Sequence, residues 1–340
     1  MRKLSGVIIG SGFWADCQIA AWNEIPDVHI KAICNRTQSK AEMLAQKFAI
    51  PKVYGDAEEM LRVEQPDFLD IITSPDTHQK YVTLAAKHGI PVICQKPLAP
   101  TLDEARQMVA VCAAAKVPLL VHENWRWQNQ IRAVKRILDE GNIGKLHRAK
   151  ILYNSSFPVF VNQPFLKDLE QFILTDMGTH ILDVARFLFG EAESLYCQTQ
   201  SVTLGIKGED MASVDLRMQS GMSCHVELSY ASKLENERFP EVFMQIEGAL
   251  GSIELAPDMW VRVTTDAGTT TERFAPPQYD WADPKYALVQ TSMVALQQHF
   301  YDVLTGKTAT AETTGEDNLK TLELVFKAYE SSGLNQVVAI

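Results

Sequence analysis

The first 120 residues alternate short apolar runs with helical stretches, and this alternation limits the possible folds more than any other feature. The apolar runs, rich in Ile, Val and Leu, lie at residues 7–9, 30–34, 68–72, 92–94 and 119–121. The helical stretches between them lie at about 13–23, 39–48, 56–63, 77–88 and 101–115. Continuous apolar runs are typical of parallel strands that are buried on both faces. Strand and helix in strict alternation predict an α/β, doubly wound parallel sheet with right-handed crossovers.

A glycine turn follows the first of these strands and opens the first helix. Gly10, Gly12 and Ala15 give the pattern Gly-x-Gly-x-x-Ala. Gly10 permits the tight turn, Gly12 lets the backbone approach a pyrophosphate, and Ala15 lets helix and strand pack closely. A helix N-terminus favours phosphate through its N–H groups and dipole. We therefore expect dinucleotide binding here, with Phe13 and Trp14 beside the cofactor, rather than a turn of purely structural role.

The residues after the second strand leave the identity of the dinucleotide open. Folds of this kind often place Asp or Glu there to bind the adenosine ribose, whereas this chain has Asn35 and Arg36. Without a carboxylate, a 2′-phosphate is not repelled, and Arg36 could pair with it. Asn35 could still bind a ribose hydroxyl, while Arg36 could stack on adenine or remain solvated. NAD and NADP are both compatible with this pattern.

The pattern changes after about residue 124. Helices are expected at about 129–140 and 176–189, and most of the chain from there to about residue 274 reads as strand. Apolar residues alternate with polar ones within residues 211–218 and 223–230, which indicates antiparallel strands with one face on a core. We therefore expect two domains, residues 1–123 and residues 124–340.

Composition excludes several classes of partner. The formal net charge is −10 and no long basic run occurs, which argues against nucleic acid or an anionic membrane surface. No apolar stretch reaches the roughly 18 residues of a membrane span. The six cysteines include no Cys-x-x-Cys pair, and no signal-type cleavage pattern precedes the first strand. We expect a cytoplasmic protein with free, buried thiols.

Three further segments occur in order after the glycine turn. They are Ile-Thr-Ser-Pro-Asp-Thr-His at 72–78, Gln-Lys-Pro-Leu at 95–98 and Asp-Met-Gly-Thr-His-Ile-Leu-Asp at 176–183. With the turn, this arrangement resembles the Gfo/Idh/MocA oxidoreductases, the family of glucose–fructose oxidoreductase and inositol dehydrogenases. The stretch at 121–128, together with Cys-Asn-Arg-Thr and Cys-Gln-Lys-Pro, is similar to the D-apiose dehydrogenase-like branch of that family.

The resemblance implies both an architecture and an activity. It implies a nicotinamide-binding Rossmann domain and an α+β domain with a large, mostly antiparallel open sheet. The second domain would bind substrate and assemble into homodimers or homotetramers through that sheet. The activity implied is NAD(P)-dependent hydride transfer between a sugar or polyol carbon and nicotinamide C4. The cofactor-binding positions expected beyond the turn are Asn35, Arg36, Ser74, Pro75, His78, Gln95 and Lys96.

The family's catalytic lysine matches Lys96, which follows the strand at 92–94. The family usually has Glu-Lys-Pro, whereas this chain has Gln95. A neutral residue at that position removes a negative charge beside the lysine and could alter its pKa. The alternative is that Lys96 is only a surface lysine before a turn-forming proline.

Asp176 and His180 are four residues apart, so they share one face of a helix. Taken without the resemblance, Asp176 could be a helix N-cap and His180 a core histidine. With it, His180 is the expected general base, since its ordinary pKa of about 6.5 suits proton transfer. Lys96 would polarise the reacting oxygen, and Asp176 would hold a neighbouring hydroxyl or orient the site.

Aromatic and polar residues near residue 125 are candidates for the substrate pocket. Asn124, Trp125 and Arg126 could line a sugar site, with Tyr153 as a further wall. The alternative is an aromatic packing cluster between domains. Tyr279 and Trp281 are weaker candidates. No metal site is expected, because no His-Glu-x-x-His motif or Cys/His cluster accompanies these residues.

Two other functions compete with a sugar dehydrogenase. The same fold could act on a non-sugar alcohol, as dihydrodiol dehydrogenase-like relatives do, or could sense nicotinamide or sugar without turnover. The presence of Lys96, Asp176 and His180 together favours catalysis. The particular sugar, its stereochemistry, the direction of reaction and the oligomer size do not follow from the sequence.

Overall fold

The computed structural model describes residues 2–340, which fall into two compact units. Unit 1 contains residues up to 124 and residues 290–320. Unit 2 contains residues 125–289 and 321–340. Residues 290–320, which were expected in the second domain, thus pack in the first unit.

Unit 1 is built on a six-stranded sheet in the order β3-β2-β1-β4-β5-β6, all pairs parallel. The strands are β1 (Leu4–Ile9), β2 (Val28–Cys34), β3 (Lys52–Tyr54), β4 (Phe68–Ile71), β5 (Val92–Gln95) and β6 (Leu119–His122). Every residue of β4, β5 and β6 is buried, as expected of a sheet covered on both faces. The strand order reverses between β1 and β4, and ligands of such sheets bind at the carboxyl ends beside this switch point. The predicted doubly wound parallel sheet is confirmed.

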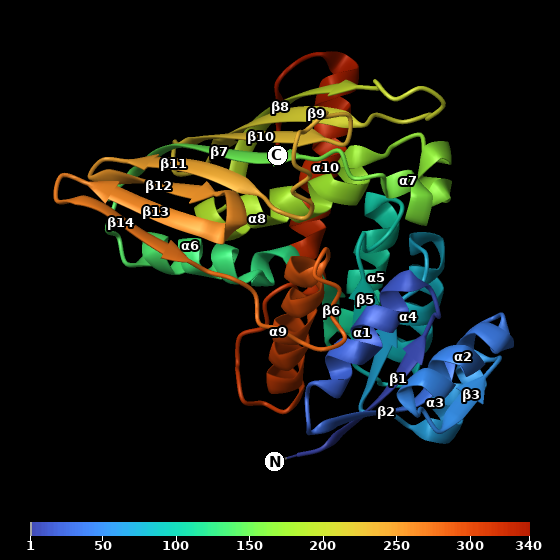
Figure 1. The fold of residues 1–340 in the computed structure, drawn as a ribbon. Helices are drawn as coiled ribbons and strands as arrows, with labels where there is room; N and C mark the ends of the chain where they lie inside the picture. Colours follow the sequence, from blue (N-terminus) through green and yellow to red (C-terminus); the bar gives the residue numbers. More distant parts are fainter. Residues whose placement is uncertain (1) are drawn as a thin grey trace. The chain divides into compact units, whose positions relative to one another are not determined.

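Helices connect the strands of unit 1 (Figure 1). They are α1 (Phe13–Asn23), α2 (Gln38–Phe48), α3 (Ala57–Glu64), α4 (His78–Lys87) and α5 (Leu102–Ala115), with a 3-10 turn η1 (Pro75–Thr77) before α4. Most of α9 (Ala287–Leu304), which follows the last strand of unit 2 along the chain, also belongs to unit 1. Two of them begin at a side-chain cap. Asp56 accepts from the Glu59 N–H at 2.7 Å, and Thr101 accepts from the Glu104 N–H at 3.2 Å. Each cap satisfies a backbone donor that the first helical turn leaves without a partner.

Unit 2 is built on a nine-stranded sheet in the order β14-β13-β12-β11-β7-β10-β9-β8-β15. The strands are β7 (Leu146–Asn154), β8 (Ala192–Gln200), β9 (Met211–Met218), β10 (Ser223–Ser229), β11 (Phe243–Gly248), β12 (Gly251–Ala256), β13 (Trp260–Thr265), β14 (Gly268–Arg273) and β15 (Val338–Ala339). Of its strand pairs within residues 2–340, β7 with β10 is parallel and the others are antiparallel. The large, mostly antiparallel sheet is therefore confirmed.

Helices of unit 2 pack on the apolar face of this sheet. α6 (Asn129–Asp139) contacts β12 and β13, and α8 (Thr179–Phe189) contacts β7 and β10. The remaining helical segments are η2 (Trp125–Trp127), α7 (Val159–Asn162), η3 (Pro164–Asp168), η4 (Leu174–Gly178), η5 (Pro257–Met259) and α10 (Gly315–Leu334), of which α10 runs through both units. The predicted alternation holds: Val214 and Leu216 of β9 and Val226 and Leu228 of β10 are buried.

Two expectations from composition can be compared with the structure. All six cysteines are buried free thiols, as expected. Among residues 2–340, the helices are each too short or too polar to cross a bilayer.

Candidate functional site

The glycine turn joins β1 to α1 at the carboxyl edge of the parallel sheet. Gly10 has a φ of +119°, and a Cβ there would lie 2.0 Å from the Ile72 carbonyl oxygen. Gly12 is the N-cap of α1 with a φ of −83°, and nothing lies within 4 Å of where its Cβ would be. Gly10 is therefore required by the fold itself, while Gly12 leaves open space at a helix N-terminus. That space suits a pyrophosphate.

Phe13 and Trp14 follow Gly12 at the start of α1, and Asn35 and Arg36 follow β2. Phe13 is half exposed, and its ring meets that of Trp14 edge to face with centroids 5.1 Å apart. Asn35 follows β2, where its side-chain amide donates to the Thr37 carbonyl at 2.9 Å, and Arg36 beside it is exposed. Both residues lie at the end of β2, as an adenosine-binding pair requires.

His78 joins the two loops that follow β4 and β5. Its ring nitrogens lie 3.0 Å from the carbonyl oxygens of Thr73 and Leu98, and the side chain is fully buried. Burial lowers the pKa of His78, although the two carbonyls oppose that shift. Ser74 and Pro75 begin η1 just before it. In this structure His78 fixes loop positions, and its direct contact with a cofactor stays a prediction.

A buried polar network lies beneath the turn. Asp70 of β4 accepts from the indole N–H of Trp22 at 2.8 Å and from the Gln18 amide at 3.3 Å to each oxygen. Burial raises the pKa of Asp70 to about 7. Gln95 donates to Gln18 at 2.6 Å and accepts from the Lys96 backbone N–H at 2.7 Å. The side chain of Gln95, expected at the cofactor, thus points into the interior of unit 1.

Asp70, Gln18 and Trp22 were not predicted from the sequence. A signal was present for Asp70, because a carboxylate within a run that is otherwise Phe, Leu and Ile has to find buried donors.

In unit 2, an aromatic cluster surrounds His180. The indole of Trp125 in η2 stacks on the imidazole of His180 in α8, with centroids 4.9 Å apart and planes 23° apart. Tyr153 of β7 meets the Trp125 ring edge to face at 5.7 Å. All three side chains are buried. His180 is therefore buried with its ring stacked on an indole.

Asp176 lies in η4, a π-helical turn that runs directly into α8. Such turns are often found at functional sites. The Tyr230 hydroxyl, just beyond β10, donates to the Asp176 carboxylate at 3.1 Å. Burial, followed by the charge of Asp176, raises the pKa of Tyr230. The ring of Tyr153 meets that of Tyr230 at 5.7 Å, so one aromatic series connects Asp176 with His180. Tyr230 lies in the stretch 223–230, for which the sequence predicted only an antiparallel strand.

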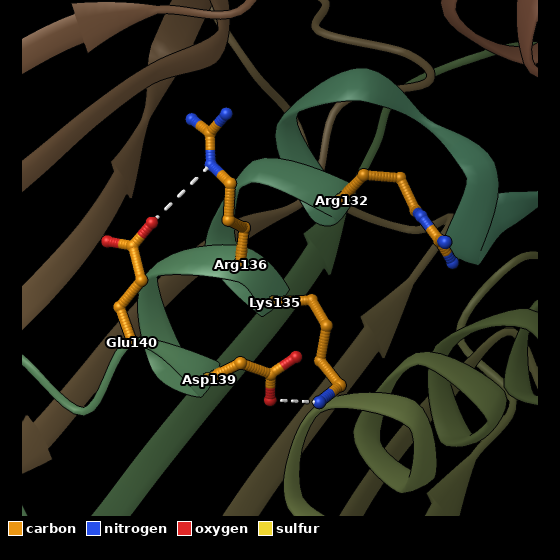
Figure 2. Close-up of a pocket in the computed structure, with 5 residues that line it drawn as sticks. All are labelled: Arg132, Lys135, Arg136, Asp139 and Glu140. Carbon is orange, nitrogen blue, oxygen red and sulfur yellow. Dashed lines mark hydrogen bonds and ion pairs between the residues drawn. The ribbon is translucent and has the colours of Figure 1, made fainter.

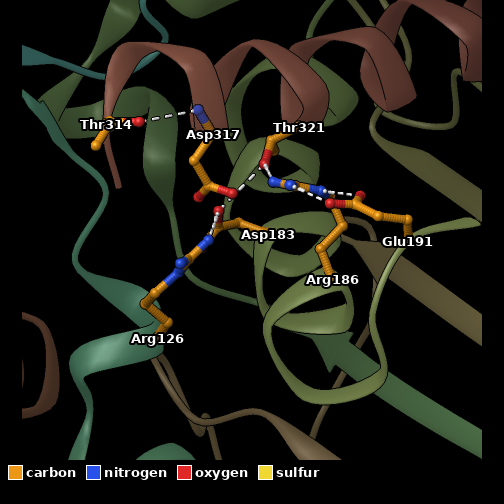
Figure 3. A network of polar contacts seen from close by, with 7 residues as sticks. All are labelled: Arg126, Asp183, Arg186, Glu191, Thr314, Asp317 and Thr321. Carbon is orange, nitrogen blue, oxygen red and sulfur yellow. Dashed lines mark hydrogen bonds and ion pairs between the residues drawn. The ribbon is translucent and has the colours of Figure 1, made fainter. Parts of the chain in front are cut away.

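Arg126 enters a buried ion pair instead of pointing into open space. Its guanidinium donates to both Asp183 oxygens, at 2.7 and 2.5 Å, and the two side chains are 6% and 0% exposed. Thr321 donates to Asp183 at 3.1 Å and accepts from Arg186, which also pairs with Glu191 (Figure 3). The pair engages Nε and Nη2 of Arg126, so a contact of Arg126 with a sugar would have to use its other N–H groups.

The remaining candidates are Asn124, Tyr279 and Trp281. Asn124, buried in unit 1, donates to the Ser292 hydroxyl at 2.8 Å. Tyr279 and Trp281 stack at 5.9 Å in the segment between β14 and α9 and are partly exposed. Over residues 2–340, no group of three or more His, Cys, Asp or Glu side chains is arranged to hold a metal ion.

A surface hollow on α6 is lined by Arg132, Lys135, Arg136, Asp139 and Glu140 (Figure 2). Lys135 pairs with Asp139, and Arg136 lies 4.0 Å from Glu140. The hollow contains none of the predicted site residues. Its ion pairs between neighbouring helical turns are those of an ordinary solvated helix face.

Comparison with known proteins identifies the class to which the chain belongs. Residues 4–123 match the model described as "Oxidoreductase family, NAD-binding Rossmann fold". Residues 131–254 match the GFO/IDH/MocA C-terminal domain. The chain therefore belongs to the Gfo/Idh/MocA oxidoreductase family, as its motifs indicated, and its first unit carries the nicotinamide-dinucleotide fold of that family.

Individual relatives agree with the suspected branch. The chain is 41% identical over 340 residues to D-apiose dehydrogenase of Rhizobium rhizogenes, covering all of this chain and 98% of the relative. It is also 41% identical to D-apiose dehydrogenase of Paraburkholderia graminis, covering 90% of that protein. The structure of an oxidoreductase from Agrobacterium radiobacter, in complex with NAD+, L-tartaric acid and magnesium, superposes with a TM-score of 0.97. It is 41% identical, over 99% of this chain and 98% of the other.

Proposed function

We propose that this protein is an NAD-dependent dehydrogenase of D-apiose or a closely similar sugar. The observation that carries the proposal is the 41% identity with two D-apiose dehydrogenases over all of this chain. Because the match includes unit 2 as well as the dinucleotide fold, it concerns the part of the chain expected to bind substrate.

His180 is the proposed general base, taking the proton from the sugar hydroxyl that is oxidised. The stack on Trp125 holds its ring in one orientation, which favours proton transfer along a fixed direction. Asp176 accepts a hydrogen bond from a neighbouring sugar hydroxyl, and Tyr230 fixes the orientation of its carboxylate. Lys96 stabilises the negative charge that develops on the reacting oxygen. The bound nicotinamide supplies the hydride acceptor.

Trp125 and Tyr153 form the proposed apolar wall for the sugar ring, since aromatic rings suit the C–H faces of sugars. Asn124 and Arg126 are proposed to support the pocket rather than to contact the sugar, because donors on each side chain are engaged with Ser292 and Asp183. The wall residues therefore set substrate selectivity, and the supporting residues set the stability of the pocket.

NAD is the proposed cofactor in preference to NADP. The family description specifies an NAD-binding fold, and the oxidoreductase at 41% identity is in complex with NAD+. In the proposed arrangement, Asn35 binds a ribose hydroxyl and Arg36 stacks on adenine. The test is the ratio of kcat/KM for the two cofactors. A preference for NADP that Arg36→Ala abolishes would assign Arg36 to a 2′-phosphate instead.

The exposed face of the nine-stranded sheet is the proposed surface for a homodimer or homotetramer. Exposed polar side chains lie between buried ones along β7, β9, β11 and β12, among them Lys150, Asp215, Gln245 and Glu254. Light scattering measures the mass in solution directly. A monomer at micromolar concentration would contradict the assembly.

The decisive experiment is a panel of aldoses and polyols that includes D-apiose, each tested with NAD and NADP. Absorbance of the reduced nicotinamide reports turnover. We expect the highest kcat/KM with D-apiose and NAD, and loss of nearly all turnover in His180→Ala. Clear cofactor binding without turnover of any sugar would favour a sensor, and turnover of a non-sugar diol alone would favour the dihydrodiol dehydrogenase-like alternative.

A further inference from the structure

A continuous chain of buried hydrogen bonds runs from Asp70 to the backbone of Lys96. It passes from Asp70 on β4 to Gln18 on α1, and from there to Gln95 on β5, whose side chain meets the Lys96 N–H. Asp70 and Gln18 are fully buried and Gln95 is nearly so. Gln297 of α9 donates to the Gln18 backbone carbonyl at 3.2 Å, which fixes the turn of α1 that carries it.

All the hydrogen bonds in this series point the same way: each donor lies on the Lys96 side of its acceptor. An ionised Asp70 can only accept, and it takes the indole N–H of Trp22 as well as the NH₂ group of Gln18. The oxygen of Gln18 is therefore turned toward Gln95 and needs a donor. Gln95 supplies one at 2.6 Å, which in turn leaves its own oxygen to accept from the Lys96 N–H at 2.7 Å. Each amide orientation follows from the one before.

This direction explains why residue 95 is an amide. A glutamate at that position could still accept from the Lys96 N–H, but it could not donate to the Gln18 oxygen. Gln18 would then have to rotate its amide, which would turn its oxygen toward the Asp70 carboxylate. The carboxylates at positions 70 and 95 would then lie on either side of the Gln18 amide. Whichever way that amide is turned, its oxygen would face one of the two carboxylates, and two acceptors would be in contact.

We propose that Asp70, Gln18 and Gln95 form a one-directional relay that positions the backbone at Lys96, and that Asp70 dictates the amide at residue 95. Gln95 is then a positioning residue, acting through the chain conformation of Lys96 and not through contact with substrate. The inference rests on the proposed role of Lys96 in the reaction.

The test is a cycle of the variants Gln95→Glu, Asp70→Asn and the two combined, measured well above pH 7, since burial raises the pKa of Asp70 to about 7. Q95E alone is expected to lower kcat by about tenfold, equivalent to a coupling of ordinary size between contacting residues. It is also expected to lower the melting temperature. In the double variant, the new amide at position 70 donates to a rotated Gln18, and Gln18 donates to the new carboxylate at position 95. Both kcat and the melting temperature should therefore recover, although neither change restores the original residue.

Two matched variants control for general effects. Gln95→Leu can neither donate nor accept, so D70N should not rescue it. Gln107→Glu introduces the same charge at an exposed amide on α5, so its effects should add to those of D70N without coupling. If the effects of Q95E and D70N simply add, the relay is wrong. If Q95E does not fold alone but the double variant does, the coupling is established in the folding readout.

Two readouts distinguish a failure of the relay from a failure of the proposed function: the melting temperature and the turnover. The stability cycle requires no substrate, so it tests the relay even if no sugar is oxidised. With turnover, a relay that positions Lys96 changes kcat while the KM for NAD stays within about twofold, as expected when an interaction formed in the transition state is lost. Rescue of the melting temperature without rescue of kcat would overturn the positioning role.

Discussion

The indole of Trp125 and the imidazole of His180 lie almost parallel, with their centroids 4.9 Å apart. Trp125 belongs to the short turn η2 and His180 to the helix α8, so the contact joins two elements far apart in sequence. The next residue after Trp125 is Arg126, which pairs with Asp183 one turn along α8 from His180. The ion pair and the ring stack thus hold the same two elements together side by side.

Removal of the indole should impair catalysis more than folding. Trp125→Leu keeps an apolar side chain but frees the His180 ring to rotate, so we expect kcat to fall about tenfold or more as proton transfer loses its fixed geometry. The KM for sugar should rise as well if Trp125 forms the wall. Trp260→Leu, at a partly exposed position on β13, is the matched control and should leave kcat unchanged. Equal kcat values for the two variants would contradict the role of the stack.

The ion pair itself should matter greatly for stability. Asp183→Asn leaves the buried Arg126 guanidinium without its carboxylate, and breaking one side of a buried pair typically costs about 3–5 kcal/mol. Denaturant unfolding measures this loss. Asp103→Asn removes one partner of the exposed Arg106 pair and should cost less than about 1 kcal/mol. A loss of similar size for both variants would mean that the buried pair contributes no more than a surface one.

The two glycines of the turn should respond differently to the same substitution. In Gly10→Ala the added Cβ meets the Ile72 carbonyl, and the φ of +119° is strained for alanine. We therefore expect the melting temperature to fall by several °C without any ligand. Gly12→Ala meets nothing and has an ordinary φ, so its melting temperature should stay near that of the parent. NAD should no longer stabilise it, because the methyl group occupies the space proposed for the pyrophosphate. Retained thermal stabilisation by NAD in G12A would place the pyrophosphate elsewhere.

The features predicted well from the sequence are those with a local cause. The alternation of apolar runs and helices predicted the parallel sheet, and the period of two in residues 211–218 predicted strand β9. The helix expected at about 176–189 was also a local feature, although its first turn, which carries Asp176, is π-helical and not regular α-helix. The catalytic roles of Lys96, Asp176 and His180 stay predictions.

The features that were missed depend on partners distant in sequence. Arg126 was expected to line a sugar site, and only the fold shows that Asp183, 57 residues away, pairs with it. Tyr230 ends a regular strand pattern, and its bond to Asp176 crosses 54 residues. Residues 290–320 return to unit 1, where Ser292 bonds to Asn124 across 168 residues. Local periodicity carries no information about such pairings.

The buried carboxyl of Asp70 should make stability depend on pH. Burial raises its folded-state pKa from 3.8 to about 7, so between these values the folded chain holds a proton that the unfolded chain has lost. The free energy of unfolding should therefore fall as pH rises from about 4 to 7, and this contribution should then level off. At about 1.36 kcal/mol per pKa unit, the total change is at most about 4 kcal/mol.

Asp70→Asn isolates this effect, because the asparagine does not titrate. Other groups change stability over nearby pH ranges: burial lowers the pKa of His78, while Asp215 and Glu227 raise the pKa of His225 against the effect of its burial. Since these groups are present in both proteins, the difference in unfolding free energy between D70N and the parent cancels them. We expect the unfolding free energy of D70N, relative to that of the parent, to rise steadily from pH 4 to pH 7, as measured by urea unfolding at each pH. Parallel curves for the two proteins would show that Asp70 is already ionised at pH 4 in the folded state.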